Sequence, residues 1–439
     1  MTVLRVIGGE PLRGRLRLPG CKGVSHRALV AAAIADGDSL LGNLGTGRDV
    51  ASTRAALGRL GVAIEDAGPG RVRVAGRGFA GLGEPAEVLD CGNSGTTMRF
   101  LAGLCAGRPF LSVLVGDASL STRPMARVLE PLRAMGARVD GRNGGRRAPL
   151  VIRGGGLVGV RHDLAVASGQ VKTALILAGL QSEGTTEIVE PAPSRDHTER
   201  LLGTLGAPIE VVDARTTRVR AGALEPFDLD VPGDPSSAAF FVVAAALVPG
   251  SHIVLEEVLG NPARLAYVDV LRAMGAAITV HPRGERGGES VVDLEVEAAP
   301  LHGTVISSRE AIVDELPVLA VAGAFATGTT EITDAAELRV KESDRVATLA
   351  EELAKLGVTV EARHDGLRIA GPAPGGTSAV SFAGHGDHRI AMAAAVAAAS
   401  GCGEATVTGW DAVDISYPEF AAHLRSLGAV IEMMDGAAQ

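Results

Sequence analysis

The chain of 439 residues is 46% hydrophobic, which allows two or more domains with sizeable cores. Its net charge of −9 and its aromatic content of 3% argue against a nucleic-acid partner, and its longest uncharged apolar run, Ala238–Val248, is too short to span a bilayer. We therefore expect a soluble, cytoplasmic protein with no membrane partner, whose four cysteines stay reduced because none stands at a C-x-x-C or zinc spacing.

The chain opens with residues 3–18, which are expected to form two short strands around Gly8-Gly9. The next stretch, Pro19–Leu29, has the composition of a turn that runs into a helix N-terminus carrying Lys22 and Arg27. The first turn of a helix has unpaired N–H groups and the positive end of the helix dipole, so cations there need a negative partner. The stretch predicts a site for a small anion, with a solvated basic turn as the alternative.

The same form recurs five more times: a polar turn, an apolar helix-like run, a turn glycine, a second helix, and a glycine before a β-like run. The two glycines that mark each copy are Gly37 and Gly61, Gly107 and Gly136, Gly184 and Gly206, Gly250 and Gly275, Gly328 and Gly357, and Gly403 and Gly428. The second glycines follow one another at intervals of 75, 70, 69, 82 and 71 residues. This regularity indicates six copies of one α/β unit of roughly 70 residues.

Six units, three in each half of the chain, predict an α/β fold of two similar domains. The extended stretch Asp228–Pro235 has the turn residues of a crossover between the halves. If the helix N-termini face the cleft between the domains, they create a positive field there without net basic charge on the protein. The expected ligands are then small polyanions such as phosphates and carboxylates.

Two further segments of the first half suit an anion. Gly92–Thr96 is a Gly-rich helix start that favours an anion-binding nest, although it lacks the lysine and spacing of a P-loop. Arg123 follows in Ser119–Met125, and its planar guanidinium suits a carboxylate or phosphate oxygen pair. A surface ion pair is the alternative for Arg123.

In the second half, Asp314-Glu315 opens a helix, which indicates either helix capping or a base that takes a proton from a substrate hydroxyl. Leu338–Arg345 has five charges in seven residues, typical of a solvated helix face, but it follows a strand-like run at the edge where functional loops lie. The lone histidine of Asp387-His388-Arg389 has no second His or Cys at metal spacing, so no metal is expected.

Together these motifs resemble the EPSP synthase family, the 3-phosphoshikimate 1-carboxyvinyltransferases, over nearly the whole chain. The segments that carry the resemblance are Pro19–Leu29, Gly92–Thr96, Arg123–Met125, Leu338–Arg345 and Asp387–Met392. Val231–Phe240 and Arg195–Glu199 are similar to the less glyphosate-sensitive branch of the family. The resemblance implies two domains of three βαβαββ-type repeats, at 20–230 and at 1–19 plus 231–439.

The implied reaction transfers the enolpyruvyl group of phosphoenolpyruvate to the 5-hydroxyl of shikimate 3-phosphate, in chorismate and aromatic amino acid biosynthesis, by addition and elimination without metal or organic cofactor. The resemblance further implies a monomer. It assigns catalysis to Lys22, Asp314 and Glu342. The implied contacts to shikimate 3-phosphate are Lys22, Arg27, Ser168, Gln170, Arg195, Asp314 and Lys341. Those to phosphoenolpyruvate are Lys22, Asn93, Gly95, Arg123, Gln170, Arg345, His388 and Arg389.

The chain departs from the family pattern at a few positions. Cys21 and Gly23 stand where the family usually has serine, Gly169 stands where many members have serine or alanine, and Ile415–Pro418 lacks a lysine that many members carry. Gly95 keeps the small residue that leaves room for glyphosate, so glyphosate inhibition is expected.

Three alternatives stay open at this point. A pathway-specific paralogue could act on a shikimate-like acid by elimination, and a non-catalytic protein could bind anions. The related UDP-N-acetylglucosamine enolpyruvyl transferase is disfavoured because it carries Lys-Asn where this chain has Lys22-Gly23.

Overall fold

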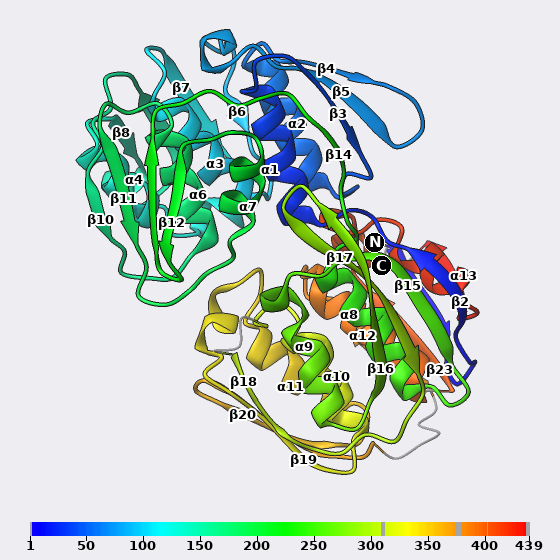
Figure 1. Ribbon diagram of the computed structural model, residues 1–439. Helices are drawn as coiled ribbons and strands as arrows, with labels where there is room; N and C mark the ends of the chain where they lie inside the picture. Colours follow the sequence, from blue (N-terminus) through cyan, green and yellow to red (C-terminus); the bar gives the residue numbers. More distant parts are fainter. Residues whose placement is uncertain (1, 309–311, 374–378, 402, 436–439) are drawn as a thin grey trace. The chain divides into compact units, whose positions relative to one another are not determined.

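The computed structural model describes residues 2–308, 312–373, 379–401 and 403–435 (Figure 1). The chain forms two compact units. The N-terminal unit is Gly20–Val231 with Glu285–Glu289, and the C-terminal unit is Met1–Pro19, Pro232–Gly284 and Ser290–Gln439. No helix in the described part of the chain is long and apolar enough to cross a membrane.

The N-terminal unit contains three repeats, each with a four-stranded sheet and two main helices. The first has α1 (Lys22–Ala33), β3 (Asp38–Gly42), α2 (Arg48–Arg59), β4 (Ala63–Asp66), β5 (Arg71–Ala75) and the distant β14 (Asp228–Asp230). The second has β6 (Leu89–Asp90), α3 (Gly95–Ala106), β7 (Leu111–Val115), α4 (Ala126–Ala134), β8 (Arg138–Gly141), the short α5 (Arg142–Gly145) and β9 (Arg147–Arg153). The third has β10 (Arg161–Asp163), α6 (Gly169–Gly179), β11 (Thr185–Val189), α7 (His197–Thr204), β12 (Ile209–Asp213) and β13 (Thr216–Arg220).

The C-terminal unit repeats this plan. Its first repeat has β2 (Arg13–Arg17), α8 (Pro235–Leu247), β15 (His252–Leu259), α9 (Pro262–Ala273), β16 (Ala277–Arg286) and β17 (Glu289–Glu297). The next has β18 (Val305–Ser307), α10 (Leu316–Phe325), β19 (Gly328–Thr333), the 3₁₀ helix η4 (Ala336–Val340), α11 (Arg345–Ala354), β20 (Thr359–Arg363) and β21 (Gly366–Gly371). The last has β22 (Val380–Ala383), α12 (His388–Gly401), β23 (Glu404–Thr408), the 3₁₀ helix η5 (Trp410–Ile415), α13 (Phe420–Ser426), β24 (Val430–Asp435) and β1 (Thr2–Ile7).

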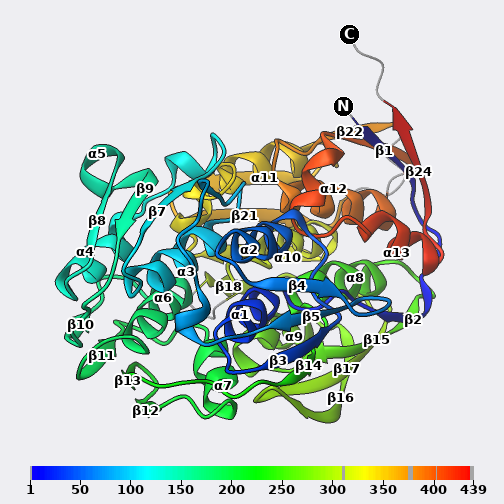
Figure 2. The same ribbon diagram turned by 90° about the horizontal axis from the view of Figure 1, so that it is seen from above.

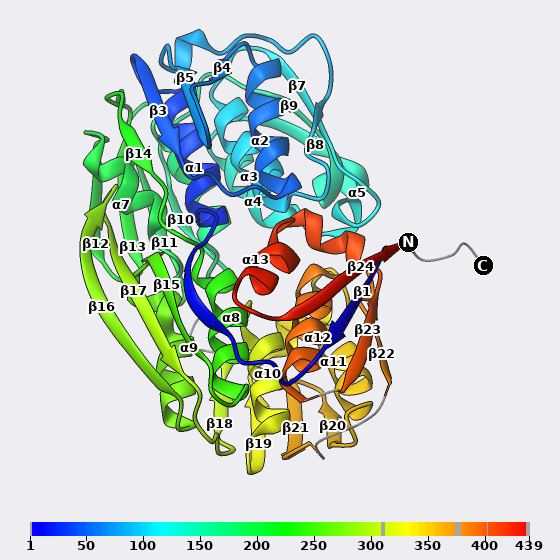
Figure 3. The ribbon, with the colours of Figure 1, turned by 90° about the vertical axis from the view of Figure 1, so that its right-hand side faces the viewer.

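All six sheets share one strand order, which confirms the predicted α/β repeat. A parallel edge strand pairs with the strand after the first helix, and two antiparallel strands follow, as in β6-β7-β9-β8 and β18-β19-β21-β20. Three sheets borrow a strand from far along the chain. In the last, β1 lies between β23 and β24, with Leu4 opposite Val407 and Met433 (Figure 3).

Ten of the twelve marker glycines have positive φ, and the exceptions are Gly107 and Gly403. A residue with positive φ ends a helix readily only when it lacks a side chain. The second glycine of a pair ends its helix, as Gly61 does directly after the last residue of α2 and its cap Leu60. The first glycine lies in the turn beyond the helix end, as Gly37 does after α1, or at the start of the next strand, as Gly328 does in β19.

The first helices of the repeats form the core of each unit. In the N-terminal unit α3 packs on α6 and contacts α1, and in the C-terminal unit α8, α10 and α12 pack on one another (Figure 2). Alanine and glycine permit this close packing: a Cβ on Gly103 of α3 would lie 2.1 Å from the carbonyl oxygen of Ala174 on α6. The predicted Ala, Val and Leu core is confirmed.

Five aromatic side chains nevertheless cluster in the C-terminal unit. Phe420 is fully buried, and its ring centroid lies 5.2 Å from that of Phe241, 5.7 Å from Tyr417, 5.8 Å from Phe240 and 6.0 Å from Trp410. This cluster attaches α13 and η5 to α8.

We expect Phe420→Ala to lower the free energy of unfolding by about 3–5 kcal/mol, because it removes the ring at the centre of this cluster. Trp410 is the single tryptophan, so its fluorescence during urea unfolding reports on the C-terminal unit. Phe79→Ala, at a half-buried position of the N-terminal unit, is the matched control and should leave the Trp410 transition unchanged. A wild-type midpoint in Phe420→Ala would contradict the expectation.

Candidate functional site

Most of the residues singled out in the sequence lie at helix starts. Lys22 begins α1, Gly95 begins α3, Arg345 begins α11 and His388 begins α12. Helix starts carry unpaired N–H groups and the positive end of the dipole, so they attract anions and disfavour cations. Each lysine or arginine placed there therefore requires a compensating group.

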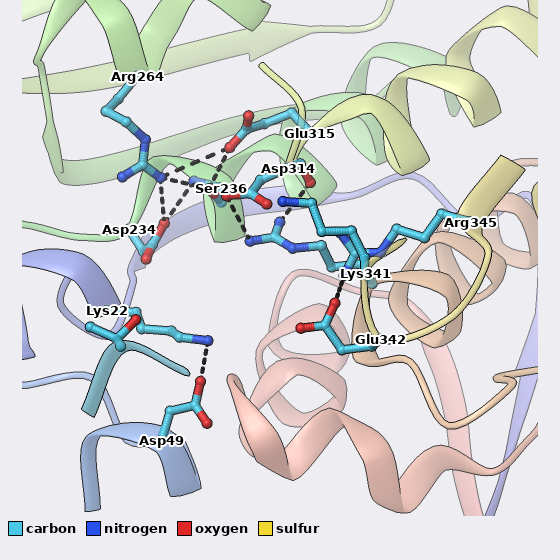
Figure 4. Close-up of polar contacts among 12 residues, drawn as sticks. Lys22, Asp49, Asp234, Ser236, Arg264, Asp314, Glu315, Lys341, Glu342 and Arg345 are labelled. Atoms are coloured by element: carbon cyan, nitrogen blue, oxygen red, sulfur yellow. Dashed lines mark hydrogen bonds and ion pairs between the residues drawn. The ribbon is translucent and has the colours of Figure 1, made fainter. Parts of the chain in front are cut away.

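For Lys22 that group is Asp49. Its Oδ2 lies 2.5 Å from Lys22 Nζ, and the Asp49 side chain is 8% exposed in the first turn of α2 (Figure 4). The dipole of α2 favours a carboxylate at this position. Asp49 therefore fixes the lysine ammonium at a defined place, while the Lys22 side chain as a whole stays 29% exposed.

Arg27, one turn further along α1, is buried and held by oxygen atoms of uncharged groups. It donates to Thr198 Oγ1 at 2.6 Å, to the carbonyl of Gly23 at 2.8 Å and to Thr173 Oγ1 at 2.9 Å. Its guanidinium carbon lies 5.0 Å from the centroid of the Phe100 ring. Burial lowers the pKa of Arg27 to about 10, which leaves it protonated at neutral pH and able to bind a carboxylate.

Arg123 contacts Asn93, which lies just before the start of α3. Arg123 donates to Asn93 Oδ1 at 2.8 Å and to the Asn93 carbonyl at 3.3 Å, and Asn93 Nδ2 donates to Asp117 at 2.8 Å. Ser94 caps α3 by accepting from the N–H of Thr97 at 3.1 Å. The predicted anion nest is thus a capped helix start with an arginine beside it.

Arg99 was not predicted from the sequence. It lies one turn after Gly95 in α3, where it is buried and donates to Gln170 Oε1 at 2.5 Å and to the Pro124 carbonyl at 3.2 Å. Gln170 in turn donates to Thr96 Oγ1 at 2.9 Å. The signal that could have found Arg99 is that it is the single charged residue of an otherwise uncharged helix.

Ser168 caps α6, accepting from the N–H of Val171 at 3.5 Å and donating its own N–H to Glu190 at 3.1 Å. Lys172 of the same helix contacts Glu190 at 2.8 Å and Glu199 at 2.7 Å. Burial opposes the charge of Lys172, but the two carboxylates outweigh it and raise its pKa. Glu190 thus contacts both Ser168 and Lys172, and these buried contacts hold the start of α6 in place.

Arg195 is half-buried just before α7, and its backbone lies against Gly169. A Cβ on Gly169 would stand 3.1 Å from the Arg195 carbonyl oxygen. The glycine at this position is therefore fitted to the close approach of the Arg195 backbone.

In the C-terminal unit, Arg345 is fully buried between two carboxylates. Its Nε donates to Asp387 Oδ2 at 2.7 Å, and its Nη2 donates to Glu342 Oε2 at 2.7 Å and to Asp387 Oδ1 at 3.1 Å. Burial raises the pKa of Asp387, but the adjacent Arg345 charge outweighs it and holds that pKa well below its usual range. The solvated-face reading of this segment is therefore wrong for Arg345.

Asp314 and Arg389 meet beside this group. Arg389 Nη1 donates to the Asp314 carbonyl at 2.7 Å, and its Nη2 lies 3.8 Å from Asp314 Oδ2. His388 is buried in the first turn of α12. Lys341 donates to Glu337 at 3.0 Å, whereas its neighbour Glu342 accepts from Arg345.

The predicted capping role of the Asp314-Glu315 pair is wrong for Glu315. It occupies the capping position of α10, yet its side chain makes no capping hydrogen bond. Instead it accepts from Ser236 Oγ and lies 3.9 Å from Arg264 Nη2 (Figure 4). A buried cation competes for this carboxylate more strongly than the helix N–H groups do.

Three groups of His, Asp and Glu side chains lie close enough to share a metal ion within the described ranges. They are Asp196, His197 and Glu289; His252, Glu295 and Glu297; and Glu351, Glu352 and His385. In each, one ring nitrogen of the histidine is hydrogen-bonded to a carboxylate, at 2.5, 2.8 and 2.7 Å respectively.

We expect Asp387→Asn to lower the free energy of unfolding at pH 7 by about 3–5 kcal/mol, because it leaves the buried Arg345 charge under-compensated. The pKa of Asp387 is lower in the folded than in the unfolded chain, where it is about 3.9. Its stabilisation is therefore present above about pH 4 and lost as the pH falls further.

Urea unfolding of wild type and Asp387→Asn from pH 7 to pH 3 measures this effect, and the difference between them should shrink below pH 4. Asp269→Asn removes an exposed carboxylate, 82% accessible, and serves as the control. A difference of less than about 1 kcal/mol at pH 7, the size seen for surface pairs, would show that Asp387 is not a buried partner in solution.

Comparison with known proteins gives a consistent result. The family model of EPSP synthase (3-phosphoshikimate 1-carboxyvinyltransferase) matches residues 6–424. A protein named 3-phosphoshikimate 1-carboxyvinyltransferase from Halorhodospira halophila is 50% identical over 434 residues, covering 98% of this chain and 97% of that protein. The protein of the same name from Roseiflexus castenholzii is 49% identical over 429 residues, covering 96% and 99%.

Solved structures agree. An EPSP synthase from Acinetobacter baumannii superposes with a TM-score of 0.88 at 38% identity and covers 99% of this chain and 100% of its own. The enolpyruvyl transferase NikO from Streptomyces tendae has a TM-score of 0.78 at 21% identity, with 99% of both chains covered, and shares the fold.

Proposed function

The chain belongs to the EPSP synthase family, the 3-phosphoshikimate 1-carboxyvinyltransferases, and on that basis we propose how its own residues carry out the reaction. The protein transfers the enolpyruvyl group of phosphoenolpyruvate to the 5-hydroxyl of shikimate 3-phosphate, which yields 5-enolpyruvylshikimate 3-phosphate and phosphate. This is a step of the shikimate pathway to aromatic amino acids. The observation that carries the residue roles is the placement of paired cations and carboxylates at helix starts.

Phosphoenolpyruvate is bound, in this proposal, by Arg123, Arg345 and Arg389, with Lys22 beside the reacting carbon. Asn93, Gly95 and the buried His388 complete the contacts. Two polyanions repel each other, so the main electrostatic task is to hold both against a ring of fixed cations. The ion pairs Lys22–Asp49 and Arg345–Asp387 support this role, because they hold the cations in place before substrate arrives.

Shikimate 3-phosphate is bound through its carboxylate by Arg27 and through its phosphate by Ser168. Ser168 caps α6, and a helix start suits a phosphate. Gln170, with its amide held by Arg99 and Thr96, lies beside the ring. Arg195 and Lys341 complete the contacts.

The proton transfers fall to Asp314 and Glu342. Asp314 takes the 5-hydroxyl proton as that oxygen bonds to carbon 2 of phosphoenolpyruvate, and Glu342 gives a proton to carbon 3. In the tetrahedral intermediate carbon 3 then returns a proton to the Glu342 carboxylate, the bond from carbon 2 to the phosphate oxygen breaks, and phosphate leaves. Lys22 stabilises the charge that develops on the bridging oxygens.

We expect Asp314→Asn and Glu342→Gln each to lower kcat by about 10²–10⁴-fold, the usual contribution of general acid–base catalysis. The assay follows phosphate release together with mass detection of the enol ether, starting from shikimate 3-phosphate and phosphoenolpyruvate. Glu351→Gln, on the exposed face of α11, is the control. Wild-type turnover in either variant would remove that residue from the proposed mechanism.

Glyphosate is proposed to compete with phosphoenolpyruvate near Gly95. A Cβ at this position would lie 2.7 Å from Arg99 Nη1, the atom that donates to Gln170. Because Gly95 has no side chain, it leaves space for the inhibitor and does not disturb the hydrogen bond from Arg99 to Gln170.

We expect millimolar glyphosate to raise the apparent KM for phosphoenolpyruvate in the wild type. Gly95→Ala should weaken the inhibition at least about tenfold and also raise KM for phosphoenolpyruvate, because the methyl group must displace Arg99; tenfold corresponds to about 1.4 kcal/mol. Gly203→Ala adds a methyl group where no atom lies within 4 Å of the new Cβ, and should behave as wild type. Unchanged wild-type turnover in glyphosate would contradict the competition.

A paralogue that eliminates from a shikimate-like acid and a non-catalytic anion binder are both disfavoured, since relatives near 50% identity match over almost the whole chain. At Gly23, a Cβ would meet only Arg27 Nη1, at an ordinary contact distance of 3.6 Å. The structure therefore has room for the serine that the family usually carries here. We further propose that the protein acts as a cytoplasmic monomer. Cys91 and Cys105 are buried, and burial raises the pKa of Cys105 to about 11, which keeps that thiol unreactive.

A further inference from the structure

Arg264 is a buried arginine for which the reaction scheme has no role. It lies in the first turn of α9, which begins after the capping residue Asn261, and it is 4% exposed. A helix start disfavours a cation, and burial removes the water that would otherwise solvate it. Arg264 can therefore be buried only if carboxylates from neighbouring elements surround it.

Those carboxylates come from the starts of two other helices. Asp234 caps α8, and its Oδ1 accepts from the N–H of Ser236 at 2.8 Å and lies 3.4 Å from Arg264 Nη2. Glu315 lies at the start of α10, 3.9 Å from the same nitrogen. Because α8 packs against both α9 and α10, one arginine joins three helix starts (Figure 4).

Ser236 bridges the arginine and the glutamate. Arg264 Nη2 donates to Ser236 Oγ at 2.6 Å, and Ser236 Oγ donates to Glu315 Oε1. Ser236 is 4% exposed and Glu315 is 1% exposed. A hydrogen-bonded chain of buried polar groups of this kind fixes its members in one arrangement, since breaking it leaves a charge unpaired.

Glu315 directly follows Asp314, the proposed base. The Glu315 side chain is bound by Ser236 on the buried side, whereas the Asp314 carbonyl accepts from Arg389 at 2.7 Å. The Asp314 carboxylate itself is 20% exposed. The backbone at the start of α10 is therefore held at two adjacent residues by two different arginines, one of them acting through a serine.

We propose that Arg264, Ser236 and Glu315 are positioning residues that set the direction of the Asp314 carboxylate. The inference rests on the proposed role of Asp314 as the base. None of the three is among the proposed substrate contacts. Its effect passes through the backbone that Glu315 and Asp314 share, and a small misplacement of a base lowers the rate steeply.

The test compares Arg264→Lys and Glu315→Gln with wild type. Lysine at position 264 keeps the positive charge but lacks the planar guanidinium whose nitrogens donate in fixed directions. Glutamine at position 315 keeps the shape of the side chain but lacks its negative charge. We expect kcat to fall about 10–100-fold, within the range that general base catalysis contributes, while KM for shikimate 3-phosphate changes less than about threefold. The kcat–pH profile should also change, because the Asp314 carboxylate then lies differently relative to the charges of Arg389 and Arg345.

Arg272→Lys makes the same change on the exposed side of α9, where the arginine side chain is 42% accessible, and should match wild type. If Arg264→Lys does not fold, Ser236→Ala removes the bridge and leaves both charges in place, and the same losses are expected. The double variant Arg264→Lys with Glu315→Gln should lose about as much as the worse single variant, since the residues act as one unit.

Two results would overturn the proposal. One is a kcat within twofold of wild type in the folded variants. The other is a loss of kcat accompanied by an equal loss of shikimate 3-phosphate affinity with an unmoved pH profile, which indicates general damage to the unit. Asp314→Asn in the same series separates this failure from failure of the base assignment: if that variant keeps wild-type turnover, Asp314 is not the base.

Discussion

Charge at the starts of helices is the constraint on which this protein depends. An enzyme for two polyanions needs fixed cations, and the fold offers helix starts, which already carry partial positive charge. Lysines and arginines at such positions repel the dipole and lose solvation. The chain solves this with a carboxylate at nearly every one: Asp49 for Lys22, Asp387 for Arg345, and Asp234 with Glu315 for Arg264.

These partnerships also determine what each cation can do. Arg345 is enclosed by Glu342 and Asp387, which fix its position and also neutralise part of its positive charge. Arg27 is held by hydroxyl and carbonyl oxygens, so more of its charge is available to a ligand. The repeated unit therefore provides positions for cations near helix starts. A carboxylate partner makes the cation an anchor, whereas neutral oxygen partners leave its charge available to bind a ligand.

The sequence was sufficient to predict the six repeats, their helices and the turn glycines between elements, because these features depend on local conformation. It also placed Lys22 and Arg27 at a helix start and singled out Arg123 and Arg345 as candidate site residues. It did not predict the partners, since Asp49 and Asp387 are 27 and 42 residues from the cations they bind and no local pattern joins them.

Glu315 shows why local reasoning fails at this kind of position. A carboxylate at a helix start normally caps it, and only the tertiary arrangement reveals that a buried arginine 51 residues away binds it instead. Arg99 was missed for a related reason: within the helix it is one charge among apolar residues, and its partner Gln170 belongs to another repeat.

The pairing of β1 has a consequence for how the chain is made. This strand is synthesised before the N-terminal unit, yet both of its neighbours, β23 and β24, follow that unit in the chain. The N-terminal unit has all but a short hairpin tip of its residues between Gly20 and Val231, so it can fold during synthesis, whereas the final sheet must wait with an unpaired strand. Arg5 of β1 pairs with Glu404 at 2.7 Å and with Glu432 at 3.1 Å, one on each neighbour. A charged residue on a strand that is not yet paired discourages pairing with other nascent chains, and the two ion pairs add to the cross-strand contacts once the sheet is complete.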